Sequence, residues 1–212
     1  MNRKARYSYI IDYFNKHNPN PISELQYINP YELLVAVILS AQCTDKRVNM
    51  ITPNFFIHYP SPEKLAKAQI HEIFDQIKSI SYPNNKAKHL SGMAKMLVEE
   101  FDGIVPDNID DLQKLPGVGR KTANVVVSVI FNKPAMAVDT HVFRVSARIG
   151  LTVNAKNPTQ AEKQLVAHIP ENLIAKAHHW LILHGRYTCL ARKPLCYQCG
   201  IRDVCLYYTT IS

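Results

Sequence analysis

The chain has 212 residues, of which 47% are hydrophobic and 20% are charged. That length supports a hydrophobic core, and the composition excludes a disordered or fibrous chain. Lys and Arg number 25 against 17 Asp and Glu, and the formal net charge of +8 favours an anionic partner such as nucleic acid or an acidic membrane surface. Residues 1–12 lack the apolar run of a signal peptide or a membrane span, so we expect a cytoplasmic protein with no membrane segment.

The sequence predicts that most of the chain forms helices of roughly 8 to 20 residues. Pro, Asn and Gly residues separate these segments, and in no segment do apolar and polar residues alternate with the period of a strand. There is no internal repeat. We therefore predict an all-α protein of about ten short helices. The boundaries between helices are expected at residues 60–62, 82–85, 102–107, 134 and 154–158.

Two apolar runs, residues 33–39 (LLVAVIL) and 125–131 (VVVSVIF), also fit a buried strand, since β-branched residues fill three of the seven positions in the first and five of the seven in the second. Propensity alone does not decide between a strand and a helix for either run. Context favours helices: Pro30 lies at a plausible helix start before the first run, and the second run continues directly from residues 120–124.

Residues 115–123 read Leu-Pro-Gly-Val-Gly-Arg-Lys-Thr-Ala after a short amphipathic segment. The pattern predicts a helix, a tight hairpin and a second helix over about residues 109–131. Gly117 and Gly119 would let backbone N–H groups approach an anion closely, and the second helix would offer its positive end to a phosphate. With Arg120, this hairpin would bind the DNA backbone without reading its sequence. An ordinary turn between two packed helices is the alternative.

Lys121 falls in the first turn of that second helix, where the helix dipole disfavours a charged ammonium group. A nucleophilic amine must be neutral, so the position suits a catalytic lysine. A solvated surface lysine and a simple phosphate contact are the alternatives.

The second motif is VDTHVFRV at residues 138–145, in which Asp139 follows Lys121 by eighteen positions. Asp139 is typical of the N-cap of a helix that would run to about Ile149. A carboxylate in that position could also accept a proton and stabilise a sugar cation while a glycosidic bond breaks. His141 fits a DNA contact, a core histidine or a capping histidine.

The third motif is a group of four cysteines within seventeen residues, separated by six, two and five residues. In a reducing compartment such a group indicates a metal site rather than disulfides. Four thiolates suit either tetrahedral zinc or a [4Fe–4S] cluster, and the presence of a single CxxC unit favours the cluster. The four are Cys189, Cys196, Cys199 and Cys205.

Arg192 and Lys193 lie between the first two of these cysteines. A loop that is fixed by a metal and carries cations is suited to hold a DNA phosphate. A solvated basic loop is the alternative.

The segments LPGVGRKTANVV at 115–126, VDTHVFRV at 138–145 and LSAQCTD at 39–45, together with the cysteine spacing, resemble endonuclease III. This family belongs to the helix-hairpin-helix DNA glycosylase superfamily, and the resemblance covers nearly the full length of the chain.

The resemblance implies an all-α, two-domain fold with a C-terminal [4Fe–4S] cluster loop. Residues 1–21 together with 134–212 would form the iron–sulfur cluster domain, and residues 22–133 would form a six-helix domain. The active cleft would lie between the two domains.

The resemblance also implies a bifunctional enzyme of base excision repair, acting as DNA glycosylase and abasic-site lyase. Lys121 would attack the anomeric carbon of the sugar with the assistance of Asp139, the damaged base would leave, and a Schiff base would form before β-elimination breaks the strand on the 3′ side. The expected partner is double-stranded DNA with damaged pyrimidines or abasic sites, and the expected cofactor is one [4Fe–4S] cluster per chain. We expect a monomer that works at the bacterial nucleoid.

Members of the family flip the damaged nucleotide out of the duplex and fill the gap with side chains. Gln42 matches the filling glutamine of the family. Tyr82 stands where well-known bacterial members carry a leucine wedge, and an aromatic ring there could stack on the flanking bases and alter the preference for the opposite base. Cys43 lies outside the metal motif and is expected to be a buried helix cysteine.

Three other functions fit part of the pattern. Mismatch adenine glycosylases share the hairpin, the aspartate and the cysteines but generally lack a lysine at the position of Lys121. A pyrimidine-dimer glycosylase of the same lysine-bearing family is a second alternative. A non-catalytic DNA-binding module with a structural zinc is the third, although the joint presence of Lys121 and Asp139 argues against it.

Overall fold

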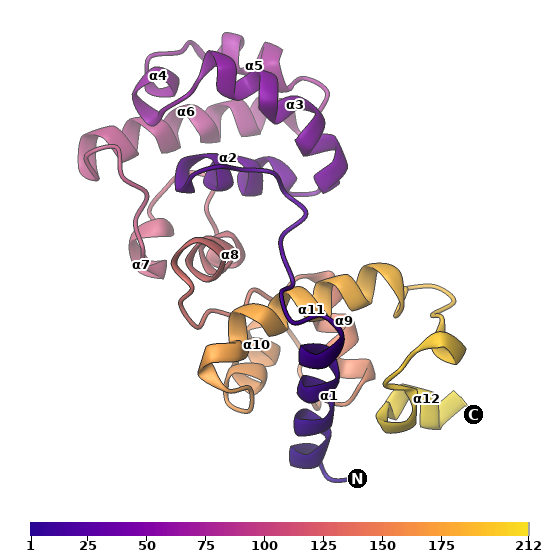
Figure 1. Cartoon of the computed structure of the whole chain (residues 1–212). Helices are drawn as coiled ribbons and strands as arrows, with labels where there is room; N and C mark the ends of the chain where they lie inside the picture. Colours follow the sequence, from indigo (N-terminus) through magenta and orange to yellow (C-terminus); the bar gives the residue numbers. More distant parts are fainter. Residues whose placement is uncertain (212) are drawn as a thin grey trace. The chain divides into compact units, whose positions relative to one another are not determined.

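The computed structural model describes residues 1–211 (Figure 1). Over that range it contains twelve α-helices, three short 3-10 helices and no strand, so the all-α prediction is confirmed. None of the described helices is long and apolar enough to cross a membrane. Contacts divide the described chain into a central unit, residues 23–131, and a terminal unit, residues 1–22 together with the segment from Asn132 onward.

The central unit contains seven helices in its described sequence. They are α2 (Pro30–Ser40), α3 (Asp45–His58), α4 (Pro62–Ala66), α5 (Ile70–Ile77), α6 (Pro83–Glu100), α7 (Ile109–Leu112) and α8 (Arg120–Phe131).

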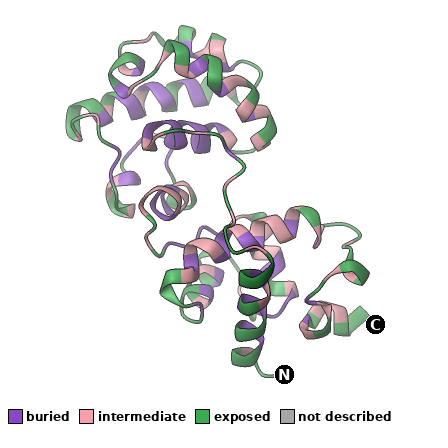
Figure 2. Cartoon of the chain, viewed as in Figure 1, coloured by how far each residue is buried: buried purple, intermediate pink, exposed green. Residues whose placement is uncertain are grey.

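Helix α2 is the buried helix of the central unit. It begins at Pro30, where the side chain of Asn29 caps the helix by accepting from the N–H of Glu32 at 2.9 Å. All side chains of residues 33–39 are buried, and Figure 2 shows the helix buried along most of its length. It contacts α3, α6 and α8. A helix covered on every side needs no polar face, which explains why its sequence also fits a strand.

The second disputed run, residues 125–131, is likewise helical and forms most of α8. Helix α6 packs against α4 and α5. Leu90, Met93 and Leu97 are fully buried on it, at the i, i+3 and i+7 spacing of one helix face. The predicted boundaries at Pro62 and Pro83 are confirmed, because each proline begins a helix, α4 and α6 respectively.

The terminal unit joins the first helix of the chain to the helices that follow Asn132. Its α-helices are α1 (Arg3–His17), α9 (Thr140–Arg148), α10 (Pro158–Val166), α11 (Ile174–Tyr187) and α12 (Leu206–Ile211), and its 3-10 helices are η1 (Glu171–Leu173), η2 (Cys196–Gln198) and η3 (Arg202–Val204).

One apolar core holds the terminal unit together. Tyr7 and Phe14 of α1 are buried in it with Val142 of α9 and Trp180 of α11. Two hydrogen bonds tie the first segment to the distant ones: the Tyr7 hydroxyl donates to the carbonyl of Leu151 at 2.9 Å, and the Trp180 indole N–H donates to the carbonyl of Asn18 at 2.7 Å. Burial raises the pKa of Tyr7 to about 12, so its phenol remains a donor at neutral pH.

Candidate functional site

The predicted hairpin is present between α7 and α8 in the central unit. The N–H of Val118 donates to the carbonyl of Leu115 at 3.0 Å, and the carbonyl of Gly119 accepts the first helical hydrogen bond, from Ala123. Lys121 is the second residue of α8, in its first turn, and is exposed to solvent. The lysine is therefore placed at the positive end of a twelve-residue helix.

The two glycines of the hairpin, Gly117 and Gly119, occupy positions with different structural requirements. Gly117 has φ +82°, and a Cβ atom built there would lie 2.8 Å from Cβ of His89. Both backbone and packing therefore require glycine at this position. A Cβ built at Gly119 would meet no protein atom within 4 Å. Nothing inside the protein requires a glycine there, so its absent side chain leaves open surface for an outside molecule.

Asp139 lies in the terminal unit and is the N-cap of α9, as predicted. Its Oδ1 accepts from the N–H of Val142 at 2.8 Å, and the helix ends at Arg148, one residue before the predicted Ile149. The cap bond fixes the carboxylate at the start of the helix. His141 is half-buried in the first turn of α9, with its Nδ1 at 3.3 Å from Nη2 of Arg144.

Two arginines on α9 hold the loop that carries the first cysteine. Arg144 donates through Nη2 to the carbonyl of Gly185 at 2.9 Å and to the carbonyl of Cys189 at 3.1 Å. Arg148 donates to the carbonyls of Leu190 at 2.7 Å and Ala191 at 3.0 Å, and its Nη1 lies 3.6 Å from Sγ of Cys189. The helix that begins at Asp139 thus also fixes the cysteine loop.

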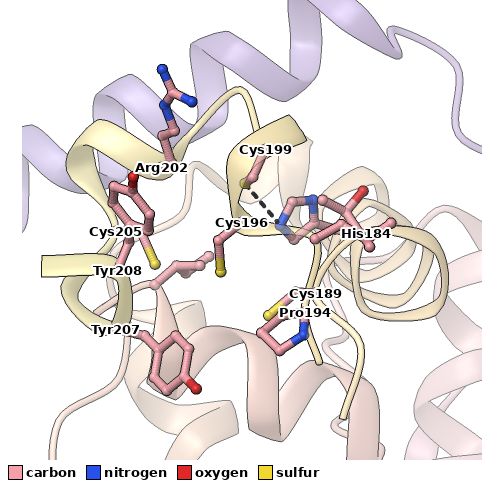
Figure 3. Close-up of a pocket in the computed structure, with 12 residues that line it drawn as sticks. His184, Cys189, Pro194, Cys196, Cys199, Arg202, Cys205, Tyr207 and Tyr208 are labelled. Atoms are coloured by element: carbon pink, nitrogen blue, oxygen red, sulfur yellow. Dashed lines mark hydrogen bonds between the residues drawn. The ribbon is translucent and has the colours of Figure 1, made fainter. Parts of the chain in front are cut away.

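The four cysteines of the third motif line a single cavity (Figure 3). Ile149, Pro194 and Tyr207 contribute to its wall. Within residues 1–211, no three Cys, His, Asp or Glu side chains are grouped as the ligands of one metal ion. All four cysteines nevertheless line the same cavity.

Burial shapes the protonation of the groups around this cavity. It raises the pKa of the Cys199 and Cys205 thiols, so in the absence of a metal both are protonated at neutral pH. Burial also lowers the pKa of His184 to about 4, which keeps this imidazole neutral. Its Nε2 lies 3.8 Å from Sγ of Cys199, within reach of a weak hydrogen bond to sulfur.

The basic loop between Cys189 and Cys196 is closed by backbone hydrogen bonding. The N–H of Leu195 donates to the carbonyl of Thr188 at 2.9 Å. Arg192 and Lys193 are both exposed at the outside of this loop, and Lys193 has a left-handed backbone with φ 51°. The loop presents two cations from a braced backbone.

Gln42 and Tyr82 are both exposed residues of the central unit with left-handed backbones, at φ 55° and φ 56° respectively. Gln42 lies in the turn after α2, and Tyr82 is the N-cap residue of α6. Such conformations are uncommon for residues other than Gly, Asn and Asp and tend to occur where function or packing demands them. The expectation for Cys43 was wrong: it is half-buried and lies in the turn rather than in a helix, because α2 ends at Ser40.

Arg144 and Arg148 are the residues that sequence reasoning missed in the terminal unit. Their spacing of four residues places them on one face of a helix, which was the available signal. Their partners are carbonyl groups more than forty positions away, and no sequence pattern indicates such partners.

Residues 35–171 match the family described as HhH-GPD superfamily base excision DNA repair protein. Endonuclease III of Rickettsia conorii is 50% identical over 203 residues, which cover 96% of this chain and 96% of that protein. Endonuclease III of Escherichia coli strain K12 is 43% identical over 204 residues, with the same coverage of both chains.

A solved structure of a trapped covalent intermediate of endonuclease III with DNA, in an estranged-adenine complex, is also similar. It superposes with a TM-score of 0.94 at 42% sequence identity, and the match covers 100% of this chain and 99% of that chain. The likeness thus extends over both units and all three motifs.

Proposed function

The chain belongs to the HhH-GPD superfamily of base excision DNA repair proteins, within it to the endonuclease III family, and we propose that Lys121 and Asp139 carry its chemistry. The protein is a bifunctional DNA glycosylase and abasic-site lyase that acts on double-stranded DNA. Its substrates in this proposal are oxidised or otherwise damaged pyrimidines and abasic sites, and it acts on them as a monomer at the bacterial nucleoid.

In the proposed mechanism the neutral Nζ of Lys121 attacks C1′ of the damaged nucleotide. An N–C1′ bond forms, the glycosidic bond breaks, and the base leaves with the bonding electron pair and takes up a proton. The sugar ring opens to a protonated Schiff base, whose positive nitrogen makes the C2′ proton acidic. Loss of that proton expels the 3′ phosphate, and hydrolysis of the remaining Schiff base releases Lys121.

Asp139 is proposed to assist the first step. A carboxylate can accept a proton from the attacking amine and stabilise the cationic sugar as the base departs. The cap bond to Val142 supports this role because it fixes the carboxylate at the start of α9.

DNA is held through its backbone in this proposal. The hairpin with Gly117, Gly119 and Arg120 approaches one phosphate, and the open surface at Gly119 supports that contact. Arg192 and Lys193 on the braced loop neutralise further phosphates. His141, whose Nδ1 lies 3.3 Å from Nη2 of Arg144, is proposed as a further DNA contact.

Gln42 and Tyr82 are proposed to fill the gap that the flipped nucleotide leaves. Both are exposed, and both stand on left-handed backbones at the ends of helices. Tyr82 offers an aromatic face on which a base can stack. Gln42 offers an amide that can hydrogen-bond with the orphaned base on the opposite strand.

The metal in this proposal is a [4Fe–4S] cluster ligated by Cys189, Cys196, Cys199 and Cys205. All four cysteines line one cavity, and the single CxxC unit in their spacing favours a cluster over tetrahedral zinc. That cavity supports a cluster, which would fasten the loop bearing Arg192 and Lys193.

The observation that carries the proposal is the likeness, over the whole chain, to an endonuclease III in covalent complex with DNA, with Lys121 at an exposed helix start. The test is incubation of the protein with a duplex that contains one abasic site, in the presence of borohydride. We expect a covalent adduct whose peptide map places the DNA on Lys121. An adduct on another amine, or none, would refute the assignment.

A further inference from the structure

Lys86 is a buried lysine that the mechanism above does not use. It is the fourth residue of α6, and only 5% of its surface is exposed. Burial lowers the pKa of its ammonium group, which reflects the cost of removing a charge from water. Such a group persists inside a protein when specific partners compensate that cost.

The partners of Lys86 are two backbone carbonyls at the end of α2. Its Nζ donates to the carbonyl of Leu39 at 2.8 Å and to the carbonyl of Ala41 at 2.7 Å. The last carbonyls of a helix have no helical partner, and a cation there also interacts favourably with the helix dipole. Lys86 therefore joins the start of α6 to the end of α2, two neighbouring helices of the central unit (Figure 1).

The carbonyl of Ala41 belongs to the turn that presents Gln42. The N–H of Cys43 donates to the carbonyl of Ser40 at 3.0 Å, Ala41 has φ −57° and ψ 113°, and Gln42 has φ 55°. These are the features of a type II turn, which normally requires glycine or asparagine where Gln42 stands. Conversion to a type I turn would rotate the peptide between Ala41 and Gln42 and reverse the Ala41 carbonyl. The bond from Lys86 holds that carbonyl in the type II orientation.

The backbone of the same lysine supports Tyr82. The N–H of Lys86 donates to the carbonyl of Tyr82 at 3.2 Å, which is the first hydrogen bond of α6. Tyr82 is left-handed, with φ 56° and ψ 50°. A single residue thus contacts both turns that carry the gap-filling side chains, one through its side chain and the other through its backbone.

We propose that Lys86 is a positioning residue that locks the Gln42 turn and sets it relative to Tyr82, so that both side chains can enter the duplex together. This inference rests on the proposed function in one respect, namely that Gln42 and Tyr82 fill the gap. Lys86 itself touches neither the sugar nor the base, and it acts on extrusion and orphan-base contact rather than on bond breaking.

The test compares two duplexes with the same abasic site, one intact and one with a one-nucleotide gap opposite the site. The gapped duplex has no orphaned base for Gln42 to contact. We expect Lys86→Met to slow single-turnover β-elimination by roughly ten- to hundredfold on the intact duplex, as misplacement of a positioning group does, and by at most about twofold on the gapped one. Equal slowing on both duplexes would overturn the proposal.

A double-mutant cycle separates positioning from a general loss of stability. If Lys86 acts through Gln42, Lys86→Met should have a much smaller effect on the intact duplex when Gln42→Ala is already present. Full additivity would overturn the proposal. Lys95→Met is the matched control, because Lys95 is exposed on the same helix and the substitution removes the same charge. It should leave the ratio between the two duplexes unchanged.

Two measures keep the test decisive. If Lys86→Met is too unstable to purify, Lys86→Gln retains N–H donors but is too short to reach both carbonyls, and the same comparison applies. The ratio of the dissociation constants for the two duplexes makes the same comparison by binding alone, with no strand cleavage required. Absence of cleavage by the unmodified protein would refute the proposed function, whereas a ratio that Lys86→Met leaves unchanged would refute only the role of Lys86.

Discussion

At the scale of single residues, the proposed mechanism gives Lys121 two tasks, because its nitrogen would displace the base and then remain attached while the strand breaks. Lys121→Gln keeps similar length and polarity but has no nucleophilic amine. We expect it to bind damaged duplex DNA nearly normally while base release and strand cleavage fall together by roughly 10³-fold or more. Single-turnover assays and borohydride trapping measure the loss. A trapped adduct at the normal rate would identify a different nucleophile.

Asp139→Asn should separate base release from strand cleavage, the two reactions that the proposed mechanism assigns to Lys121. Asparagine retains an oxygen that can accept from Val142, so α9 should keep its cap and the melting temperature should change little. The negative charge is lost, and we expect base release to slow by about 10²-fold, the usual contribution of a general base or charge-stabilising group. Cleavage of a preformed abasic site begins after the base has left and should be affected less. Equal slowing of both steps would contradict a role specific to base release.

The residues that the sequence predicts are those whose chemistry is local. The cap at Asp139 and the helix start before Lys121 can be inferred from neighbouring residues, and both are present. Arg148 and Lys86 could not be inferred, because each acts on backbone carbonyls that lie more than forty positions away. The left-handed backbone of Gln42 was equally hidden, since glutamine is not a residue that signals such a turn.

At the scale of elements, the two glycines of the hairpin make a matched pair. Gly117→Ala should reduce the free energy of unfolding by about 1–3 kcal/mol, because alanine is disfavoured at positive φ and its Cβ would collide with His89. Gly119→Ala should leave stability nearly unchanged and weaken binding to undamaged duplex by about tenfold, since the added methyl occupies only outside space. Thermal unfolding and DNA binding measured on both variants check this. Normal affinity in a folded Gly119→Ala would argue against a phosphate contact there.

The prolines that mark where helices begin were the most informative sequence feature for the fold. Prolines at positions 30, 62, 83 and 158 each begin a helix, because proline lacks the N–H that the first turn leaves unpaired. The apolar run at residues 33–39 was harder to assign, since a helix buried on all sides has no amphipathic period. The prediction for Cys43 was wrong for a related reason. The apolar pattern of this run does not indicate that α2 ends at Ser40.

At the scale of the whole molecule, the cysteine cavity determines what the purified protein contains. We expect a yellow-brown protein with about four irons per chain, because an iron–sulfur cluster absorbs visible light and zinc does not. Cys196→Ala should lose the colour and destabilise the loop it belongs to, whereas Cys43→Ala, outside the cavity, should retain both. Metal analysis and visible absorption provide the measurement. A colourless, fully active protein with one zinc would disprove the cluster.

The net charge of +8 predicts DNA affinity that falls steeply with salt. Lys193→Glu should weaken the binding of damaged and undamaged duplexes alike, and it should lower the slope of log Kd against log salt concentration by about one. Lys163→Glu, an equal change of charge at an exposed position of α10, serves as the control and should have a smaller effect. A loss of affinity for damaged DNA alone would show that Lys193 does more than contact the DNA backbone.

The shared core of α1 and the helices after Asn132 also bears on how the protein is made. The apolar face of α1 is translated before the residues that cover it, because Val142 and Trp180 follow more than a hundred residues later in the chain. The central unit, residues 23–131, is contiguous and can fold during that interval. We therefore expect α1 to remain uncovered until Val142 and Trp180 have been synthesised, so that the terminal unit closes after the central unit can already have folded.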